Sequence, residues 1–94
     1  MSQTRNTYIV SGGASELGAS MARHIYSRGC HVVISDLDLP GAQRIAAQLG
    51  EGAMAIACDS RDDGDIENLV ATTAARFGRL DGLVNNAVTY TDSG

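Results

Sequence analysis

Residues 11–18 have the sequence Ser-Gly-Gly-Ala-Ser-Glu-Leu-Gly, a glycine-rich segment that follows the short apolar run Tyr8-Ile9-Val10. The apolar run is typical of the end of a buried strand, and the apolar spacing that follows predicts a helix over 14–28. A turn of this kind leaves backbone N–H groups at the positive end of a helix dipole, where a phosphate is stabilised. The sequence therefore predicts a phosphate-binding turn near the start of the chain.

Short apolar runs and helical spacing alternate through the rest of the chain. Asp38 is a candidate N-cap for a second helix that Gly50 ends, and Ser60-Arg61-Asp62-Asp63 resembles a capping box for a third that Gly78 ends. The remaining strands are predicted at 31–35, 53–57 and around Leu83-Val84.

The predicted order is therefore β-α-β-α-β-α-β, which places the chain in the α/β class. Parallel strands joined by right-handed crossovers give a four-stranded sheet of order 3-2-1-4. The first two helices are expected on one face and the third on the other. A ligand is expected between the first and fourth strands, where the strand order reverses.

Composition narrows the possible functions. The chain has 94 residues, enough for one domain, and a formal net charge of −4. This charge gives no support to nucleic-acid or membrane-surface binding, and no run approaches about 18 apolar residues. No secretory signal pattern is seen, so we expect a cytoplasmic protein. We expect Cys30 and Cys58 as free thiols, and His24 and His31 as surface residues without metal-ligand spacing.

Asp36 follows the second predicted strand and lies 18 residues after Gly18. A carboxylate at this position can accept hydrogen bonds from the ribose hydroxyls of an adenosine. The alternative is that Asp36 is a turn residue that caps the second helix. Asp38 could supply that cap instead and leave Asp36 for a ligand.

Four motifs in order carry a family resemblance. The segment 10–18 resembles the TGxxxGxG fingerprint of short-chain dehydrogenases/reductases, and Asp36, Cys58-Asp59-Ser60 and Leu83-Val84-Asn85-Asn86-Ala87 match its later motifs. The resemblance covers essentially the whole chain but only the first part of a family domain. It implies that residues 1–94 are the amino-terminal half of a Rossmann-type, NAD-binding domain, and hence an incomplete domain.

The resemblance also implies roles for individual residues. Gly12 and Gly18 shape the pyrophosphate turn, and Ser15 and Leu17 approach the phosphates or ribose through backbone groups. The other expected cofactor contacts are Asp36 to the adenosine ribose, Asp59 to the adenine amino group with the Ser60 backbone beside it, and Asn86 and Ala87 after the fourth strand. For Asp59 the alternative is an N-cap near the third helix. Because Asp36 would repel a 2′-phosphate, NAD is expected in preference to NADP.

The sequence departs from the family pattern at the turn. Glu16 stands where the middle glycine is usual, and Val88 replaces the last glycine of the NNAG motif. A side chain at position 16 would strain the turn if the backbone there needed a positive φ. We expect these differences to weaken cofactor binding without abolishing it.

The family's Tyr-x-x-x-Lys pair has no counterpart here. Tyr8, Tyr26 and Tyr90 are followed four residues later by Gly12, Cys30 and Gly94, and the chain contains no lysine. We therefore expect a truncated chain with no catalytic residue of its own.

Two hypotheses follow from these observations. The first is the NAD-binding portion of a short-chain oxidoreductase that transfers a hydride between nicotinamide and an alcohol or carbonyl, inactive alone. The alternative is a non-enzymatic dinucleotide-binding or interaction module. In either case the fourth strand would leave an open sheet edge, so we expect self-association through that edge.

Overall fold

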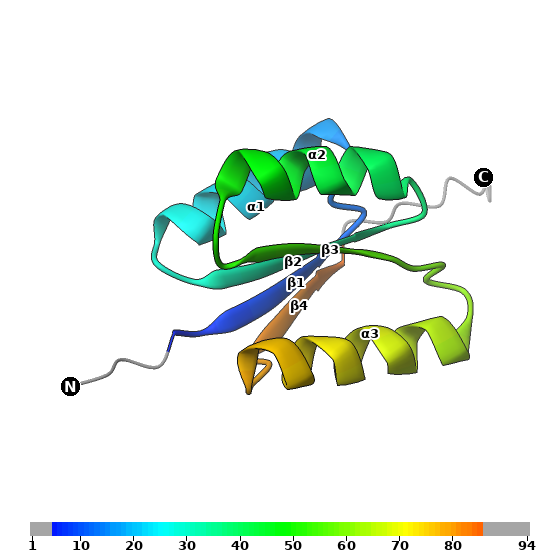
Figure 1. Cartoon of the computed structure of the whole chain (residues 1–94). Coiled ribbons are helices and arrows are strands. Elements are labelled where there is room, and N and C mark those ends of the chain that lie inside the picture. The colour runs from blue at the N-terminus through cyan, green and yellow to red at the C-terminus, as the bar shows by residue number, and fades with distance from the viewer. Residues whose placement is uncertain (1–4, 86–94) are drawn as a thin grey trace, which may run out of the picture.

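The computed structural model describes residues 5–85. Four strands and three helices alternate along them, as Figure 1 shows. The elements are β1 (Thr7–Ser11), α1 (Glu16–Ser27), β2 (His31–Asp36), α2 (Leu39–Leu49), β3 (Ala53–Ala57), α3 (Asp63–Phe77) and β4 (Gly82–Asn85). The sheet is parallel throughout, with the order β3-β2-β1-β4. This confirms the predicted α/β class and strand order.

The sheet is covered on both faces. In Figure 1, α1 and α2 lie on one side of the sheet and α3 lies on the other. Val10 and Ile34 face the first two helices, whereas Ile9 and Val33 belong to the cluster that contains Leu69 of α3. Because both faces are buried, the central residues 8–10 of β1 and 32–34 of β2 are apolar at every position, which explains the uninterrupted apolar runs in the sequence.

Helix α1 begins later than the sequence predicted. Ser15 is its N-cap and accepts a hydrogen bond from the Gly18 N–H, so the helix starts at Glu16 instead of Ala14. The Ala14 N–H is bound at 3.0 Å by the Asp36 carboxylate, a contact across 22 residues. The predicted helix over 14–28 was therefore too long at its start, because a tertiary hydrogen bond holds Ala14 in the turn.

The sequence predicted the N-cap of α2 correctly and the N-cap of α3 wrongly. Asp38 is the N-cap of α2 and accepts from the Gly41 N–H at 3.0 Å. The N-cap of α3 is Asp62, which accepts from the Asp65 N–H at 3.1 Å. The predicted capping box beginning at Ser60 is therefore wrong, and the alternative reading of Asp59 as an N-cap is wrong as well.

Strand β4 lies at one end of the sheet, since it pairs with β1 alone among the described strands. Its start is tied to the start of β1, because the Thr7 N–H donates to the Asp81 carboxylate at 2.7 Å and the Asp81 N–H donates to the Thr7 carbonyl at 2.8 Å.

Across residues 5–85, no helix has the length and apolar character that crossing a membrane requires.

Candidate functional site

The turn between β1 and α1 is built from close backbone contacts. The N–H groups of Gly12 and Gly13 both donate to the Ser35 carbonyl, at 2.8 and 3.2 Å, which ties the turn to the end of β2. Gly12 has a φ of 75°, a conformation that favours glycine. A Cβ on Gly18 would lie 2.2 Å from the Gly12 carbonyl oxygen, so the first turn of α1 packs directly on the glycine turn.

Ser15 organises the start of α1. Its hydroxyl donates to the Gly12 carbonyl at 2.9 Å and accepts from the Gly18 N–H at 3.0 Å. The N–H groups of Glu16 and Leu17 stand at this helix start, where no preceding intrahelical carbonyl is available to them. The helix dipole adds positive potential at the same place, so this end of α1 has the chemistry of an anion site.

Glu16 does not strain the turn. None of the described non-glycine residues has a positive φ, and Glu16 is the first residue of α1 with an exposed side chain. Because no positive φ is required at position 16, a side chain there does not strain the turn.

Asp36 lies between the glycine turn and the turn that leads into α2. Its Oδ2 accepts from the Ala14 N–H at 3.0 Å, and its Oδ1 accepts from the Asp38 N–H at 2.9 Å. A carboxylate offers about four acceptor positions, so each oxygen keeps one for a further donor. Because Asp38 supplies the α2 cap, Asp36 remains available for a ligand beside the turn.

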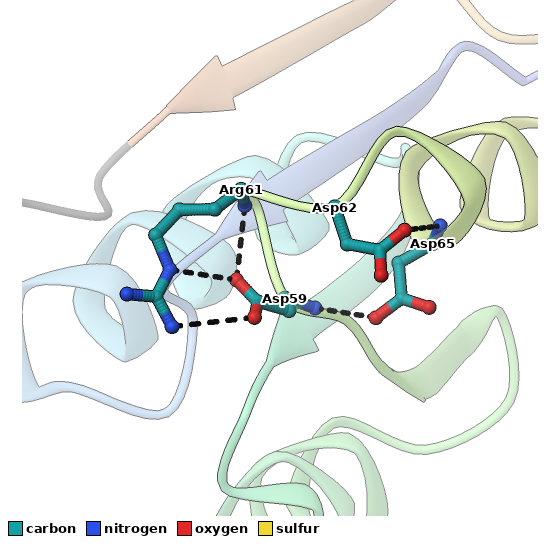
Figure 2. Close-up of polar contacts among 4 residues, drawn as sticks. All are labelled: Asp59, Arg61, Asp62 and Asp65. Atoms are coloured by element: carbon teal, nitrogen blue, oxygen red, sulfur yellow. Dashed lines mark hydrogen bonds and ion pairs between the residues drawn. The ribbon is translucent and has the colours of Figure 1, made fainter.

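Asp59 follows β3 at the same edge of the sheet. Its neighbour Cys58 donates its N–H to the Asp36 carbonyl at 3.1 Å, so the two carboxylate-bearing segments run side by side. Figure 2 shows the Asp59 carboxylate facing the Arg61 guanidinium, with Nε 3.1 Å from Oδ1. Hydrogen bonds from Arg61 hold the pKa of Asp59 below its usual range.

Ser60 is exposed and lines a cavity of about 270 Å³ on the α3 side of the sheet, whose wall is mostly apolar. The thiol of Cys58 lines the same cavity, and burial raises its pKa. Asn86 and Ala87 were also predicted to contact a cofactor, and they lie outside the described residues, as does Val88.

The structure thus brings together Gly12, Ser15, Leu17, Gly18 and Asp36 around one turn, and places Asp59 and Ser60 at the neighbouring strand end.

Three features were missed from the sequence. Arg61 pairs with Asp59, and the Ala14 N–H binds Asp36. In the sequence, this ion pair is visible only as an arginine two positions after an aspartate. Charged residues so close in sequence are usually expected on the surface, each in contact with water. His31 was expected on the surface and is half-buried, with its ring stacked 4.4 Å from that of Phe77.

Comparison with known proteins identifies the architecture. The sequence model of a family described as short chain dehydrogenase matches residues 6–93. A (21S)-21-acetoxyl-apo-melianone synthase of Melia azedarach is 44% identical over 79 residues, which are 84% of this chain and 29% of that relative. The chain therefore spans less than a third of the length of this curated relative.

Solved structures show the same fold. A 3-ketoacyl-(acyl-carrier-protein) reductase from Brucella melitensis, complexed with NADH, matches with a TM-score of 0.81 and 33% identity over 83% of this chain and 32% of its own. An actinorhodin polyketide ketoreductase with NADPH matches with a TM-score of 0.86 and 31% identity over 95% of this chain and 36% of its own. These structural neighbours bind nicotinamide dinucleotides of both kinds.

Proposed function

This chain belongs to the short-chain dehydrogenase family, and we propose that it forms the NAD-binding portion of an oxidoreductase of that family. The reaction would transfer a hydride between nicotinamide and an alcohol or carbonyl carbon. The observation that carries the proposal is the hydrogen bond between the Asp36 carboxylate and the Ala14 N–H, at 3.0 Å. This bond holds the Asp36 carboxylate, which we assign to the ribose, directly beside the turn that we assign to the phosphates.

The residues present fit the dinucleotide. A Cβ on Gly18 would lie 2.2 Å from the Gly12 carbonyl oxygen and one on Gly13 would lie 2.6 Å from the Ile34 side chain, so both glycines allow α1 and β2 to pack closely on the turn. This packing sets the N–H groups that begin α1 beside the turn, at the positive end of the helix dipole, where a pyrophosphate would be stabilised. We assign the pyrophosphate to Gly12 and Gly18, and backbone contacts with phosphate or ribose to Ser15 and Leu17. We assign the ribose to Asp36, the adenine to Asp59 and the Ser60 backbone, and the region after β4 to Asn86 and Ala87.

When bound, the dinucleotide supplies or accepts the hydride, and this chain binds and orients its adenosine half. Proton transfer to the substrate is assigned to no residue of this chain, because the Tyr-x-x-x-Lys pair has no counterpart in its sequence. The activity belongs to a protein in which such a pair completes the site.

We propose NAD as the preferred cofactor. A 2′-phosphate on the ribose would bring its negative charge beside the Asp36 carboxylate, and like charges at this distance repel. Because Asp36 is half-buried between two turns, solvent screens this repulsion only in part.

Isothermal titration of the 94-residue chain with NAD and NADP tests both proposals. We expect NAD to bind more tightly, and Asp36→Asn, which removes the charge but keeps the shape, to reduce the NAD-to-NADP affinity ratio roughly tenfold. Glu67→Gln removes an exposed carboxylate of α3 as the matched control and should leave the ratio unchanged. Equal affinities for the two dinucleotides in the parent would contradict the NAD preference, and no binding of either would contradict the function.

We further propose that the 94-residue chain associates with itself at the β4 side of the sheet. Strand β4 ends the described sheet, and the cavity of about 270 Å³ beside it is lined by the exposed apolar residues Ile66, Val70 and Leu83. An open strand edge next to an apolar surface favours pairing with a second chain.

A further inference from the structure

A second hollow lies at the edge of the sheet opposite the glycine turn. Because the strands are parallel, all of them begin at this edge, which is at the left in Figure 1. The hollow has a volume of about 500 Å³, and its lining comes from the segment before β1, from α1, from β2, from the turn before β3 and from α3. This volume lies within the range of small-molecule sites.

Two arginines bring positive charge to this hollow. Arg5 precedes β1 and Arg76 lies in the last turn of α3, and both line the hollow. Neither forms an ion pair with a carboxylate among residues 5–85, whereas Arg61 and Arg79 each pair with a nearby aspartate. The helix dipole accounts for a cation at the end of α3 but not for Arg5, which lies outside the helices. Within the described part of the chain, both guanidinium groups therefore remain available to an anion.

Stacked rings restrict the position of Arg76. Its guanidinium carbon lies 4.8 Å from the centre of the Phe77 ring. The Phe77 ring in turn stacks on His31, with 4.4 Å between the ring centres and 19° between their planes. Because His31 begins β2, this stack connects the end of α3 to the sheet and limits where the guanidinium can lie.

Arg5 reaches the hollow beside Gly52, whose φ of 92° favours glycine. A Cβ on Gly52 would lie 3.3 Å from His31 Cδ2, 3.4 Å from Arg5 Nη1 and 3.5 Å from Tyr26 Cε1, so three side chains from different segments meet around this residue. His31 is therefore close to both arginines, near Arg5 at Gly52 and linked to Arg76 through the stacked ring.

The charges around the hollow act on His31. Burial lowers the pKa of His31, and the charges of Arg5 and Arg76 lower it further. Its Nδ1 is buried and has no hydrogen-bond partner among the described residues, which also opposes a protonated ring. Glu51 brings a carboxylate to the lining, and its carbonyl accepts from the Tyr26 hydroxyl. The positive charge at neutral pH therefore comes from the two arginines.

We propose that this hollow binds a phosphate group, with Arg5 and Arg76 as its charged partners. A guanidinium group offers paired N–H donors that match the oxygens of a phosphate, and it keeps its charge throughout the ordinary pH range. Two such groups suit a dianion better than a single carboxylate, and Glu51 opposes the anion in part. The site is separate from the proposed dinucleotide site and does not depend on the proposed function.

The test follows the backbone amide signals of the 94-residue chain by NMR while inorganic phosphate is added, with sodium chloride at equal ionic strength as the reference. We expect saturable shifts at His31, Gly52 and Phe77. Glucose 6-phosphate forms a second arm of the titration. Tighter binding of this ester would identify the occupant as a small organic phosphate, and equal or weaker binding would identify it as the free ion.

Four variants test the residues. Arg5→Gln and Arg76→Gln should each weaken phosphate binding roughly tenfold, because each removes charged donors. Glu51→Gln removes a like charge from the lining and should strengthen binding. Arg23→Gln is the matched control, since it changes the net charge equally at an exposed arginine of α1 that does not line the hollow, and it should bind as the parent does.

The pKa of His31 provides a second readout. It is measured by NMR in sulfate and in chloride at equal ionic strength, because sulfate is a tetrahedral dianion whose charge is constant near neutral pH. Sulfate bound at the arginines would offset their charge, so the pKa of His31 should be higher in sulfate, and this difference should shrink in R76Q.

Three results would each overturn this inference and leave the proposed function intact. The first is a parent with no saturable shift at the hollow. The second is a set of shifts confined to residues 12–18, which would place the phosphate at the glycine turn. The third is equal weakening in R23Q and R76Q, which would show attraction by net charge alone.

Discussion

There is no room for a side chain at Gly18, because this residue packs directly against the backbone of the glycine turn. A methyl group there would lie 2.2 Å from the Gly12 carbonyl oxygen and 2.7 Å from the Gly13 Cα. Gly18→Ala should therefore push α1 off the glycine turn, lower the free energy of unfolding by roughly 1–3 kcal/mol and weaken dinucleotide binding. Urea unfolding and NAD titration measure the two effects.

Gly64→Ala is the matched control for that variant, since its added methyl would lie 3.2 Å from the Asp62 side chain, which can shift. It should leave NAD affinity unchanged. If Gly18→Ala unfolded and bound NAD as the parent does, the close packing between helix and turn would be refuted.

His31 makes stability depend on pH. Burial lowers its pKa below the ordinary 6.5, and the charges of Arg5 and Arg76 lower it further. The unfolded chain therefore takes up this proton more readily than the folded chain. The contribution of His31 is fully present above its ordinary pKa and is lost as the pH falls through its folded pKa.

Urea unfolding at pH 7.5 and at about pH 5 should show this loss in the parent and a smaller loss in His31→Gln. His24→Gln, on the exposed surface of α1, should keep the parent's pH dependence. Identical pH dependence in all three proteins would show that His31 is not the source.

Among the elements, α3 gives the sharpest test of helix capping. Asp62→Ala removes the acceptor of the Asp65 N–H and should cost about 1 kcal/mol of unfolding free energy. Ser60→Ala changes the residue that the sequence pattern pointed to and should be nearly neutral, because Ser60 does not cap the helix. Urea unfolding of both variants measures their free energies of unfolding. A larger loss in Ser60→Ala than in Asp62→Ala would contradict this assignment and favour the capping box that begins at Ser60.

The elements also show what sequence can predict. Strand β2 was predicted to within one residue, because burial on both sheet faces leaves a continuous apolar run. Strand β3 was predicted with its observed bounds from the apolar run 53–57, although none of its residues is fully buried. The α3 cap could not be predicted in this way, since Ser60 and Asp62 are both good cap formers two positions apart. In the structure, Asp59 accepts from the Arg61 N–H through its carboxylate and from the Asp62 N–H through its carbonyl, and this turn precedes the cap at Asp62.

The candidate site also contains some features that the sequence predicts and others that it does not. Gly12, Gly18 and Asp36 could be predicted, because a glycine turn and an acid at a strand end are local signals with a fixed spacing. Two contacts of the site could not be predicted, because they depend on how the folded chain places its side chains. They are the hydrogen bond from the Ala14 N–H to Asp36 and the ion pair between Arg61 and Asp59.

At the scale of the whole molecule, the proposed self-association can be tested at β4, the end strand of the described sheet. Leu83 of β4 is 58% exposed and lines the apolar cavity, so Leu83→Lys should place a charge at the edge and shift the chain toward monomer. Leu37→Lys changes a leucine that is 68% exposed and follows β2, and should leave the association unchanged. Light scattering across a concentration series measures both variants. A parent that stays at 9.8 kDa at every concentration would contradict self-association.

The pairing of β1 with both β2 and β4 has a consequence for synthesis on the ribosome. Strand β1 is made first and its partner β4 last among the described elements, with Ser11 and Gly82 separated by most of the chain. At the ordinary rate of 5–20 residues per second, that interval lasts roughly 4–14 s. During this time the edge of β1 that later pairs with β4 has no strand partner. We therefore expect the nascent chain to be most prone to misassembly before β4 pairs and the Thr7 N–H donates to the Asp81 carboxylate.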